Sequence, residues 1–380
     1  MFSFMNSRHW LGVSKGHGAK AAFIILLASA VNVAEGRADW KTEWESTLQA
    51  AKKEGQVMFY ASNRYDGVIA AFQKRYPDIK MRSVIGGSGA HSQRIMAERR
   101  AGKPIADLYT GAVSNTYRIL YKGKAFAPIR PYLILPEVID KSHWWKGKHK
   151  YLDDESKYVF VFNAQAQPYF TYNSNLVNPS EIKSYWDLLD PKWKGKLLMV
   201  DPTTSGGGNG LRLVFYSPEL GPEYLRRLLS EMDAGVSRDN RQIVDWLAVG
   251  KYVIGVFTNP RRLRVHDAKQ QGLPIDWFKS THFKEGVLLG SITGNVGILD
   301  KAPHPNAARV ALNWLLSREG QIAFQKYVVA DSRRIDIPKD DVPTDIRRME
   351  GIKYVIADTP ERLDLKPIMK VVKESWRSKR

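Results

Sequence analysis

Three short stretches of the sequence combine residue types that bind anions. Arginine pairs with carboxylate or phosphate through planar, bidentate hydrogen bonds, and Arg261 and Arg262 stand together in the run TNPRR at residues 258–262. Hydroxyl and glycine residues form the runs GSG at 87–89 and TTSG at 203–206. Where such runs open a helix, free backbone N–H groups attract negative charge. Together the three stretches predict a cleft for a small organic anion, such as a phosphonate, a phosphate ester or a carboxylate.

Polar residues at the ends of expected strands complete this site. We expect no catalytic residue, no metal ligand and no cofactor among them. For Arg261 and Arg262 a second interpretation stays open, a solvated or lobe-bridging pair, because most arginines lie on protein surfaces. The expected ligand-binding residues are Asn63, Arg64, Gly87, Ser88, Gly89, Ser114, Thr203, Thr204, Ser205, Gly206, Asn259, Arg261 and Arg262.

The first part of the chain alternates between short β-forming runs and amphipathic helical stretches. This alternation predicts βα units around a largely parallel sheet. In open α/β sheets, ligands bind beyond the carboxyl ends of the strands, and each expected strand here ends in small polar residues. The expected strands are 57–61, 79–85 and 106–109, and the expected helices are 40–54, 68–76 and 91–101.

A second βα set follows a β-rich run at residues 158–172, which is long enough to pass from one lobe to another. A run at 287–299 is expected to return as one strand, and 306–327 as a long amphipathic helix. Two βα lobes joined by two crossing segments form a hinged clamp. Within the second set we expect helices at 185–189 and 243–249 and strands at 197–200 and 252–257.

The amino terminus has the pattern of a signal peptide. Arg8, Lys15 and Lys20 precede an apolar run at residues 21–34, AAFIILLASAVNVA, and small residues follow. Cleavage could follow Ala34 or Ala38, and we favour Ala38. The run is too short for a membrane span of ~20 apolar residues, so we expect an exported protein located in the periplasm.

Composition agrees with an exported binding protein but does not identify its ligand. After residues 1–38, about 340 residues remain, which is enough for two lobes. Cysteine is absent, and a chain of this size needs no disulfide bond to be stable. Residues 1–38 hold four Lys or Arg and one Glu, so their removal lowers the net charge from +19 to +16. The basic residues are scattered, which favours a solvated surface over a nucleic-acid-binding one.

Four stretches resemble one known family. They are SYWDLLDPKWKGK at 184–196, the pair Tyr172-Asn173, APHPNAA at 302–308 with WLLSREGQ at 314–321, and SRRID at 332–336. In these stretches the chain resembles the periplasmic solute-binding proteins of ABC transporters, in the iron(III)-binding-protein-like branch. That branch also contains binders of polyamines, thiamine, phosphonates and sugar phosphates.

The resemblance implies an α/β, two-lobe periplasmic binding protein fold of type 2, with a mixed sheet flanked by helices in each lobe and crossing hinge strands. We expect lobe 1 at 39–165 plus 296–345, lobe 2 at 166–295 and a C-terminal helical tail at 346–380. The implied function is to bind a small molecule and deliver it to the membrane permease of an ABC importer. We expect a monomer that binds no nucleic acid.

The sequence departs from the iron-binding members of the family at their most diagnostic position. Those members hold ferric iron with two adjacent tyrosines in the loop that corresponds to residues 258–262, where this chain has TNPRR. Guanidinium is permanently cationic and repels a bare ferric ion. We therefore expect an organic anion, with ferric iron or an iron complex, held without a tyrosine pair, as the alternative.

An enzymatic interpretation is weaker. GGSGA at 86–90, between a strand and a helix, is similar to the nucleophile elbow of serine hydrolases. A triad also requires a histidine base held by an acid, and the later histidines stand in basic or proline-flanked contexts. We therefore expect no enzyme, with a secreted serine hydrolase as the remote alternative.

Overall fold

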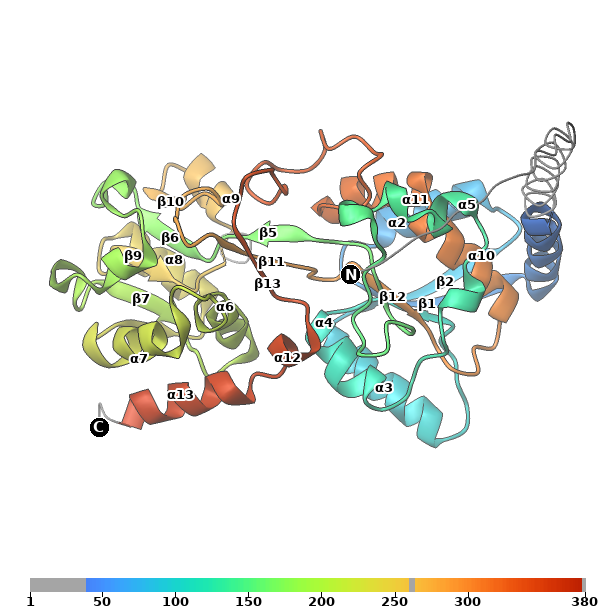
Figure 1. The fold of residues 1–380 in the computed structure, drawn as a ribbon, viewed down its shortest axis with the longest axis horizontal. Coiled ribbons are helices and arrows are strands. Elements are labelled where there is room, and N and C mark those ends of the chain that lie inside the picture. Colours follow the sequence, from blue (N-terminus) through green and yellow to red (C-terminus); the bar gives the residue numbers. More distant parts are fainter. Residues whose placement is uncertain (1–38, 260–263, 378–380) are drawn as a thin grey trace, which may run out of the picture. The chain divides into compact units, whose positions relative to one another are not determined.

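The computed structural model describes residues 39–259 and 264–377 (Figure 1). Two compact units are distinguished, and they divide after Ser46. Residues 39–54 are helical, and the helix ends at Gly55, whose φ of +70° favours glycine. The expected helix at 40–54 is confirmed. All further elements belong to the larger unit.

The first sheet has five strands in the order β2-β1-β3-β12-β4. Its first three strands are parallel, and β12 runs antiparallel to both of its neighbours. All three strands expected before residue 110 are present in it. The strands are β1 (Gln56–Ser62), β2 (Lys80–Gly86), β3 (Leu108–Tyr109), β12 (Asn295–Ile298) and β4 (Phe160–Val161).

The second sheet also has five strands, in the order β10-β6-β9-β7-β8. Strand β7 is parallel to β8 and β9, whereas β6 is antiparallel to β9 and β10. Each sheet is therefore mixed. The strands are β10 (Ile275–Trp277), β6 (Phe170–Asn173), β9 (Ile254–Val256), β7 (Leu197–Val200) and β8 (Gly235–Ser237).

A third, three-stranded sheet contains the segments that pass between the first two (Figure 1). It consists of β5 (Gln165–Gln167), β11 (Val287–Gly290) and β13 (Tyr354–Ile356). The prediction of one long strand at 287–299 is wrong: β11 ends at Gly290, and β12 begins in another sheet. The run 158–172 is likewise divided into β4, β5 and β6. A strand that changes sheets must break its hydrogen-bond ladder.

The helices surround these sheets. The expected helix at 306–327 is interrupted, because Ser317 ends α10 and its side chain caps α11. The stretch 346–380, expected to be helical, contains strand β13 before its two helices. Besides the helix at 39–54, the helices of eight or more residues are α2 (Asp66–Arg75), α3 (Ser88–Arg100), α6 (Ser205–Phe215), α7 (Gly221–Glu231), α8 (Asn240–Ala248), α10 (Pro305–Leu316) and α13 (Lys366–Arg377).

Shorter helical turns connect these elements. The expected helix at 185–189 is a 3-10 turn, closed by a capping box of Ser184 and Asp187. The short α-helical turns are α4 (Val113–Asn115), α5 (Pro136–Ile139), α9 (Val265–Gln270), α11 (Arg318–Phe324) and α12 (Pro360–Leu363). The 3-10 and π turns are η1 (Thr116–Tyr121), η2 (Arg130–Tyr132), η3 (Lys141–His143), η4 (Trp145–Gly147), η5 (Pro179–Glu181), η6 (Tyr185–Leu189), η7 (Pro191–Trp193) and η8 (Gln325–Val329).

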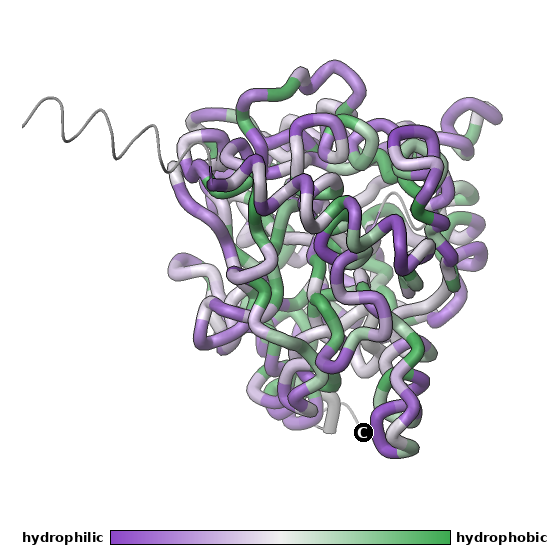
Figure 2. Tube along the Cα trace, turned by 90° about the vertical axis from the view of Figure 1, so that its right-hand side faces the viewer, coloured by the Kyte–Doolittle hydropathy of each residue, from purple (hydrophilic) through white to green (hydrophobic). Residues whose placement is uncertain are grey.

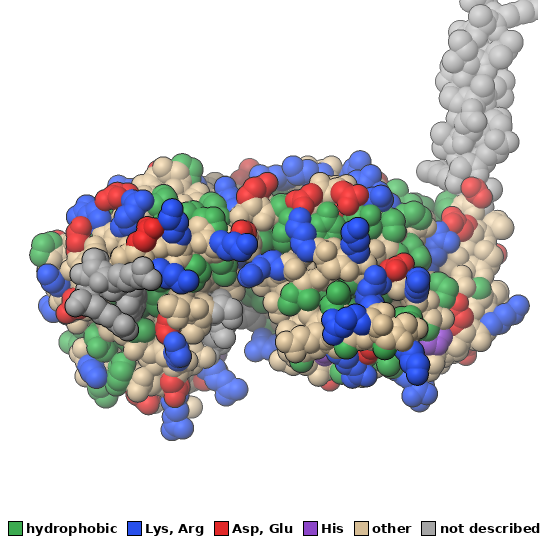
Figure 3. Space-filling view, turned by 90° about the horizontal axis from the view of Figure 1, so that it is seen from below, with side chains coloured by type: hydrophobic (Ala, Val, Ile, Leu, Met, Phe, Trp, Pro, Cys, Tyr) green, Lys and Arg blue, Asp and Glu red, His purple; other side chains and the backbone are tan. Residues whose placement is uncertain are grey.

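Hydrophobic residues line the inner strands, and hydrophilic residues follow the outer turns and helices (Figure 2). On the face drawn in Figure 3, Lys and Arg side chains are spread out with acidic residues among them, rather than gathered in one patch. No helix in residues 39–259 or 264–377 is long and apolar enough to cross a membrane.

Candidate ligand-binding cavity

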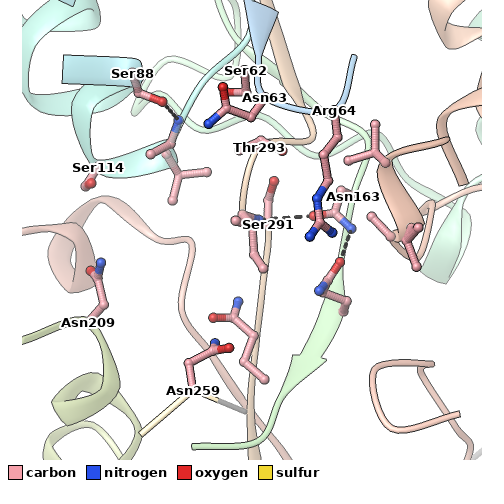
Figure 4. A pocket seen from close by; sticks show the side chains of 18 of the residues that line it. Ser62, Asn63, Arg64, Ser88, Ser114, Asn163, Asn209, Asn259, Ser291 and Thr293 are labelled. Atoms are coloured by element: carbon pink, nitrogen blue, oxygen red, sulfur yellow. Dashed lines mark hydrogen bonds between the residues drawn. The ribbon is translucent and has the colours of Figure 1, made fainter. Parts of the chain in front are cut away.

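A cavity of about 550 Å³ is lined by strand residues of the first and third sheets and by segments that adjoin the strands of the second. Its volume falls within the range of small-molecule sites, ~300–1,000 Å³. Serine, asparagine, glutamine and arginine side chains line it beside apolar wall surface (Figure 4). The lining residues are Ser62, Asn63, Arg64, Gly86, Gly87, Ser88, Ala112, Val113, Ser114, Asn163, Gln165, Gln167, Tyr169, Asn209, Arg212, Asn259, Ser291, Ile292, Thr293, Val328, Val329 and Ala330.

Six of the residues expected to bind a ligand do line this cavity: Asn63, Arg64, Gly87, Ser88, Ser114 and Asn259. Gly89, Thr203 and Thr204 do not belong to the lining. The backbone of Ser205 and Gly206 forms the first turn of α6. Arg261 and Arg262 lie outside the residues that the structure describes, so their expected role stays a prediction.

The first wall is built from the carboxyl ends of parallel strands. Asn63 and Arg64 directly follow β1, and Gly87 and Ser88 follow β2. Ser88 begins α3, a helix of 13 residues whose first N–H groups have no partner within the helix. The buried hydroxyl of Ser62 lies on the same wall and has no hydrogen-bond partner among the described residues. This wall therefore offers several hydrogen-bond donors to a ligand.

Ser88 also has a structural contact. Its Oγ accepts a hydrogen bond from the backbone N–H of Ala112 at 2.7 Å (Figure 4). This bond joins the start of α3 to the segment that follows β3. The hydroxyl oxygen, which the hydrolase alternative makes a nucleophile, thus serves as an acceptor between two loops.

The second wall comes from α6, and the sequence analysis missed it. Asn209 and Arg212 lie three residues apart, on one face of this helix. Thr203 and Thr204, which were expected there, bond instead to Asp201: their Oγ1 atoms donate to Asp201 Oδ1 at 2.6 Å and to Asp201 O at 2.7 Å. Thr204 also caps α6 by accepting the N–H of Gly207 at 3.2 Å.

Arg212 is a buried cation at the cavity, with only 5% of its surface exposed. Its guanidinium donates from Nη2 to Asn209 Oδ1 at 3.0 Å and from Nη1 to the carbonyl oxygen of Ala357 at 3.3 Å. Arg64, on the first wall, is exposed by contrast. Arg64 also has a φ of 73°, a left-handed conformation that costs energy in a residue other than glycine.

A third group of lining residues comes from the segments that connect the sheets. Asn163, Gln165 and Gln167 alternate with alanine in the run NAQAQ, and a period of two places them on one face of an extended segment. This alternation was the sequence signal that could have found them. Ser291, Ile292 and Thr293 contribute from the turn between β11 and β12.

The carboxamide oxygens of four lining residues, Asn163, Gln165, Gln167 and Asn209, are bonded within the protein. Asn163 Oδ1 accepts the N–H of Ile292 at 3.1 Å, and Gln165 Oε1 accepts from Asn163 Nδ2 at 3.2 Å. Gln167 Oε1 accepts the hydroxyl of Tyr169 at 2.8 Å. With Asn209 Oδ1 bonded to Arg212, the amide N–H groups of Gln165, Gln167 and Asn209 are left to face a ligand. The cavity is thus rich in donors.

No aspartate, glutamate or histidine lines the cavity within the part of the chain that the structure describes. In the same residues, no group of three His, Asp or Glu side chains could hold a metal ion. Tyr169 is the one tyrosine among the described lining residues, and its hydroxyl is bonded to Gln167 Oε1.

Val329 lies on the same cavity in a strained conformation, with a φ of 57° that is rare for a β-branched residue. The neighbouring Asp331 is buried and anchors this segment. Its carboxylate bonds to Arg348 Nε at 3.0 Å and to Lys339 Nζ at 3.0 Å. Burial opposes its ionisation, but these two cations hold the pKa of Asp331 below its ordinary value. Strain of this kind needs such an anchor in order to persist.

Comparison with known proteins gives the family. Residues 60–322 match the family model described as "Bacterial extracellular solute-binding protein". A protein of Haemophilus influenzae is 25% identical over 283 residues, which cover 72% of this chain and 76% of that protein.

Solved structures with the same fold include iron-binding and sugar-phosphate-binding proteins. FutA of Trichodesmium, in complex with iron and citrate, has a TM-score of 0.63 at 19% identity, over 85% of this chain and 99% of its own. AfuA of Actinobacillus pleuropneumoniae, with fructose-6-phosphate bound, has a TM-score of 0.54 at 19% identity, over 84% and 97%. The two-lobe periplasmic binding protein fold expected from the sequence is confirmed.

The proteins of this family bind solutes for ABC transporters and are not enzymes, so the hydrolase alternative is set aside. On the match over residues 60–322, this chain belongs to the bacterial extracellular solute-binding proteins.

Proposed function

We propose that this protein captures a small organic anion in the periplasm and delivers it to the permease of an ABC importer. One observation carries the choice of ligand: the polar side chains that line the cavity include two arginines and no carboxylate among the described residues. The charged oxygens of an anion accept hydrogen bonds, above all from arginine, so they suit such a lining. A cation or a polyamine would meet unfavourable charge there.

Arg212 and Arg64 have different roles in this proposal. Arg212 is buried and held in place, so its attraction for an anion is weakly screened by water. Arg64 is exposed and can approach the ligand from the opposite wall. Arg261 and Arg262 remain proposed ligand residues on sequence grounds. Amide N–H groups of Gln165, Gln167 and Asn209 would bond the uncharged hydroxyl or carbonyl oxygens of the same molecule.

A phosphate ester is the anion that we favour. The first N–H groups of α3, with the hydroxyls of Ser62 and Ser88, form the kind of cradle that binds phosphate. The similarly folded AfuA has fructose-6-phosphate bound, which supports this choice without deciding it. The export signal at 1–38, the lobe boundaries and the monomeric state expected from the sequence are parts of the same proposal.

Calorimetry tests the proposal directly. The purified chain from residue 39 would be stripped of bound ligand by reversible unfolding and titrated with fructose 6-phosphate, inorganic phosphate, methylphosphonate, citrate, ferric citrate and putrescine. We expect binding of at least one phosphate-bearing compound, none of putrescine, and none of fructose, the matched control without phosphate. Tight binding of iron from ferric citrate with no response to any free anion would contradict the proposal.

A further inference from the structure

The segment after residue 350, for which the sequence predicts no role, is built into the central sheet. Strand β13 pairs in parallel with β11, with Leu288 opposite Val355. Two glycines at the ends of β11 permit this approach. A side chain at Gly286 would collide with the backbone of Lys353, and one at Gly290 would lie 2.9 Å from both Ala357 Cβ and Asp358 Oδ1. The β11 sequence is thus adapted to the segment that covers it.

Asp358, two residues after the end of β13, is a buried carboxylate that bonds to a lining residue of the cavity. It is 4% exposed, and its Oδ2 accepts the backbone N–H of Ser291, a lining residue. Its Oδ1 has no hydrogen-bond partner among the described residues. Burial raises the pKa of Asp358 to about 6, against the opposing influence of the Ser291 N–H and of the cations Arg212, Lys150 and Arg333.

Ala357, the residue before Asp358, contacts Arg212, the buried arginine of the cavity. The carbonyl oxygen of Ala357 accepts from Arg212 Nη1, and Ala357 is itself fixed to β11 by donating its N–H to Leu289 O at 2.7 Å. The hydroxyl of Tyr216, which directly follows α6, donates to the carbonyl oxygen of Glu361 at 3.1 Å. Helix α13 packs against α6 and α7 and buries Ile368 and Val372. The segment therefore joins α6 to the central sheet.

We propose that Asp358 is a positioning residue of the ligand cavity: it fixes the Ser291–Thr293 turn while the adjoining Ala357 carbonyl orients Arg212, so the C-terminal segment forms a working part of the site. Stability alone does not account for this carboxylate, because a buried ion with one hydrogen bond costs free energy that an apolar side chain would not. The consequence for ligand affinity rests on the proposed function, whereas the ordering of the turn does not.

The test compares Asp358→Ala with Asp358→Asn in the full mature chain, with Glu374→Gln as a control. Asparagine keeps an oxygen that accepts the Ser291 N–H, whereas alanine does not. Glu374 is an exposed residue of α13, so its substitution removes one negative charge from the same segment away from the cavity. Hydrogen exchange of peptides covering 287–294 and 207–213 reports on the turn and on α6, and calorimetry with fructose 6-phosphate reports on binding.

For Asp358→Ala we expect at least tenfold faster exchange at Ser291 and Gly294 and at least tenfold weaker binding. Asp358→Asn should restore both to within about threefold, and Glu374→Gln should change neither. Unchanged exchange at 287–294 in Asp358→Ala overturns the proposal, as does weaker binding that asparagine fails to rescue.

If the unsubstituted protein does not bind fructose 6-phosphate, that result counts against the phosphate-ester proposal alone. The exchange measurements then decide on Asp358. If Asp358→Ala does not fold, exchange in Asp358→Asn decides: protection equal to that of the unsubstituted protein supports the proposal, and lost protection at Ser291 overturns it.

Discussion

The two main walls of the cavity are built by different routes. On the wall formed by β1 and β2, the residues that directly follow each strand face the cavity: Asn63 and Arg64 after β1, and Ser88 after β2. On the wall that follows β7, the equivalent residues Thr203 and Thr204 bond to Asp201 and cap α6. The cavity is reached only farther along that helix.

The difference teaches that a polar residue at a strand end can bind a ligand only when its side chain is not already hydrogen-bonded within the protein. When a threonine caps its own helix, its hydroxyl oxygen is bonded to a backbone N–H of that helix rather than to a ligand. Arg212 has the length to reach the cavity from a buried position, and its donors are oriented by Asn209 and Ala357. We therefore expect the α6 wall to supply more binding free energy than the wall after β1, although it holds fewer lining residues.

Replacing Arg212 should have the largest effect. Arg212→Met keeps the apolar stem and removes the charge, and we expect affinity for the bound anion to fall several-hundred-fold, roughly 3–4 kcal/mol, because a buried charge pair is lost. Calorimetry of the tightest anion measures this. Arg238→Met is the matched control, since Arg238 lies in the same region but its side chain is 75% exposed. Equal losses in the two variants would refute a special role for Arg212.

The pH dependence of stability should report on Asp358, the buried carboxylate whose neighbour Ala357 contacts Arg212. Between its ordinary pKa of 3.8 and about 6, Asp358 holds a proton in the folded chain that the unfolded chain has released. The contribution of this group therefore favours folding below pH 4 and is lost as pH rises through 6, by up to about 3 kcal/mol. Urea unfolding of the unsubstituted protein and of Asp358→Asn, from pH 4 to 8, measures the difference.

In that comparison, the stability of the unsubstituted protein relative to Asp358→Asn should decline with rising pH and level off above pH 7. A difference that stays constant over the whole range would mean that Asp358 does not titrate with a raised pKa.

Replacing Arg64 should have a smaller effect on binding. Arg64→Asn removes the charge while keeping a residue that tolerates the left-handed conformation. We expect about tenfold weaker binding, roughly 1.4 kcal/mol, because water screens an exposed cation. Calorimetry at two salt concentrations checks this, and the loss should shrink at high salt. A loss as large as that of Arg212→Met would remove the distinction between the walls.

Thr204→Ala should leave binding within twofold and reduce stability. The lost cap of α6 costs about 1 kcal/mol of unfolding free energy, measured by urea denaturation. Thr203→Ala, which removes a hydroxyl that bonds to Asp201 and caps no helix, is the matched control and should cost less. Loss of affinity in Thr204→Ala without loss of stability would restore the direct ligand contact expected from the sequence.

The sequence by itself determined the family, the alternation of strands and helices, and the wall after β1 and β2. Local periodicity and turn residues suffice for these features, because each depends on neighbours a few positions apart. The run TNPRR at 258–262, which has no tyrosine, predicts a departure from the iron-binding members, and that departure stays a prediction.

Only the tertiary structure decided the rest of the site. Strands β11 and β12 belong to different sheets, and the turn at Ser291, which joins them, lines the cavity. The guanidinium of Arg212 is oriented by its hydrogen bond to Ala357, which lies 145 positions farther along the chain. Such contacts leave no local pattern, because they depend on which distant segments the fold packs together.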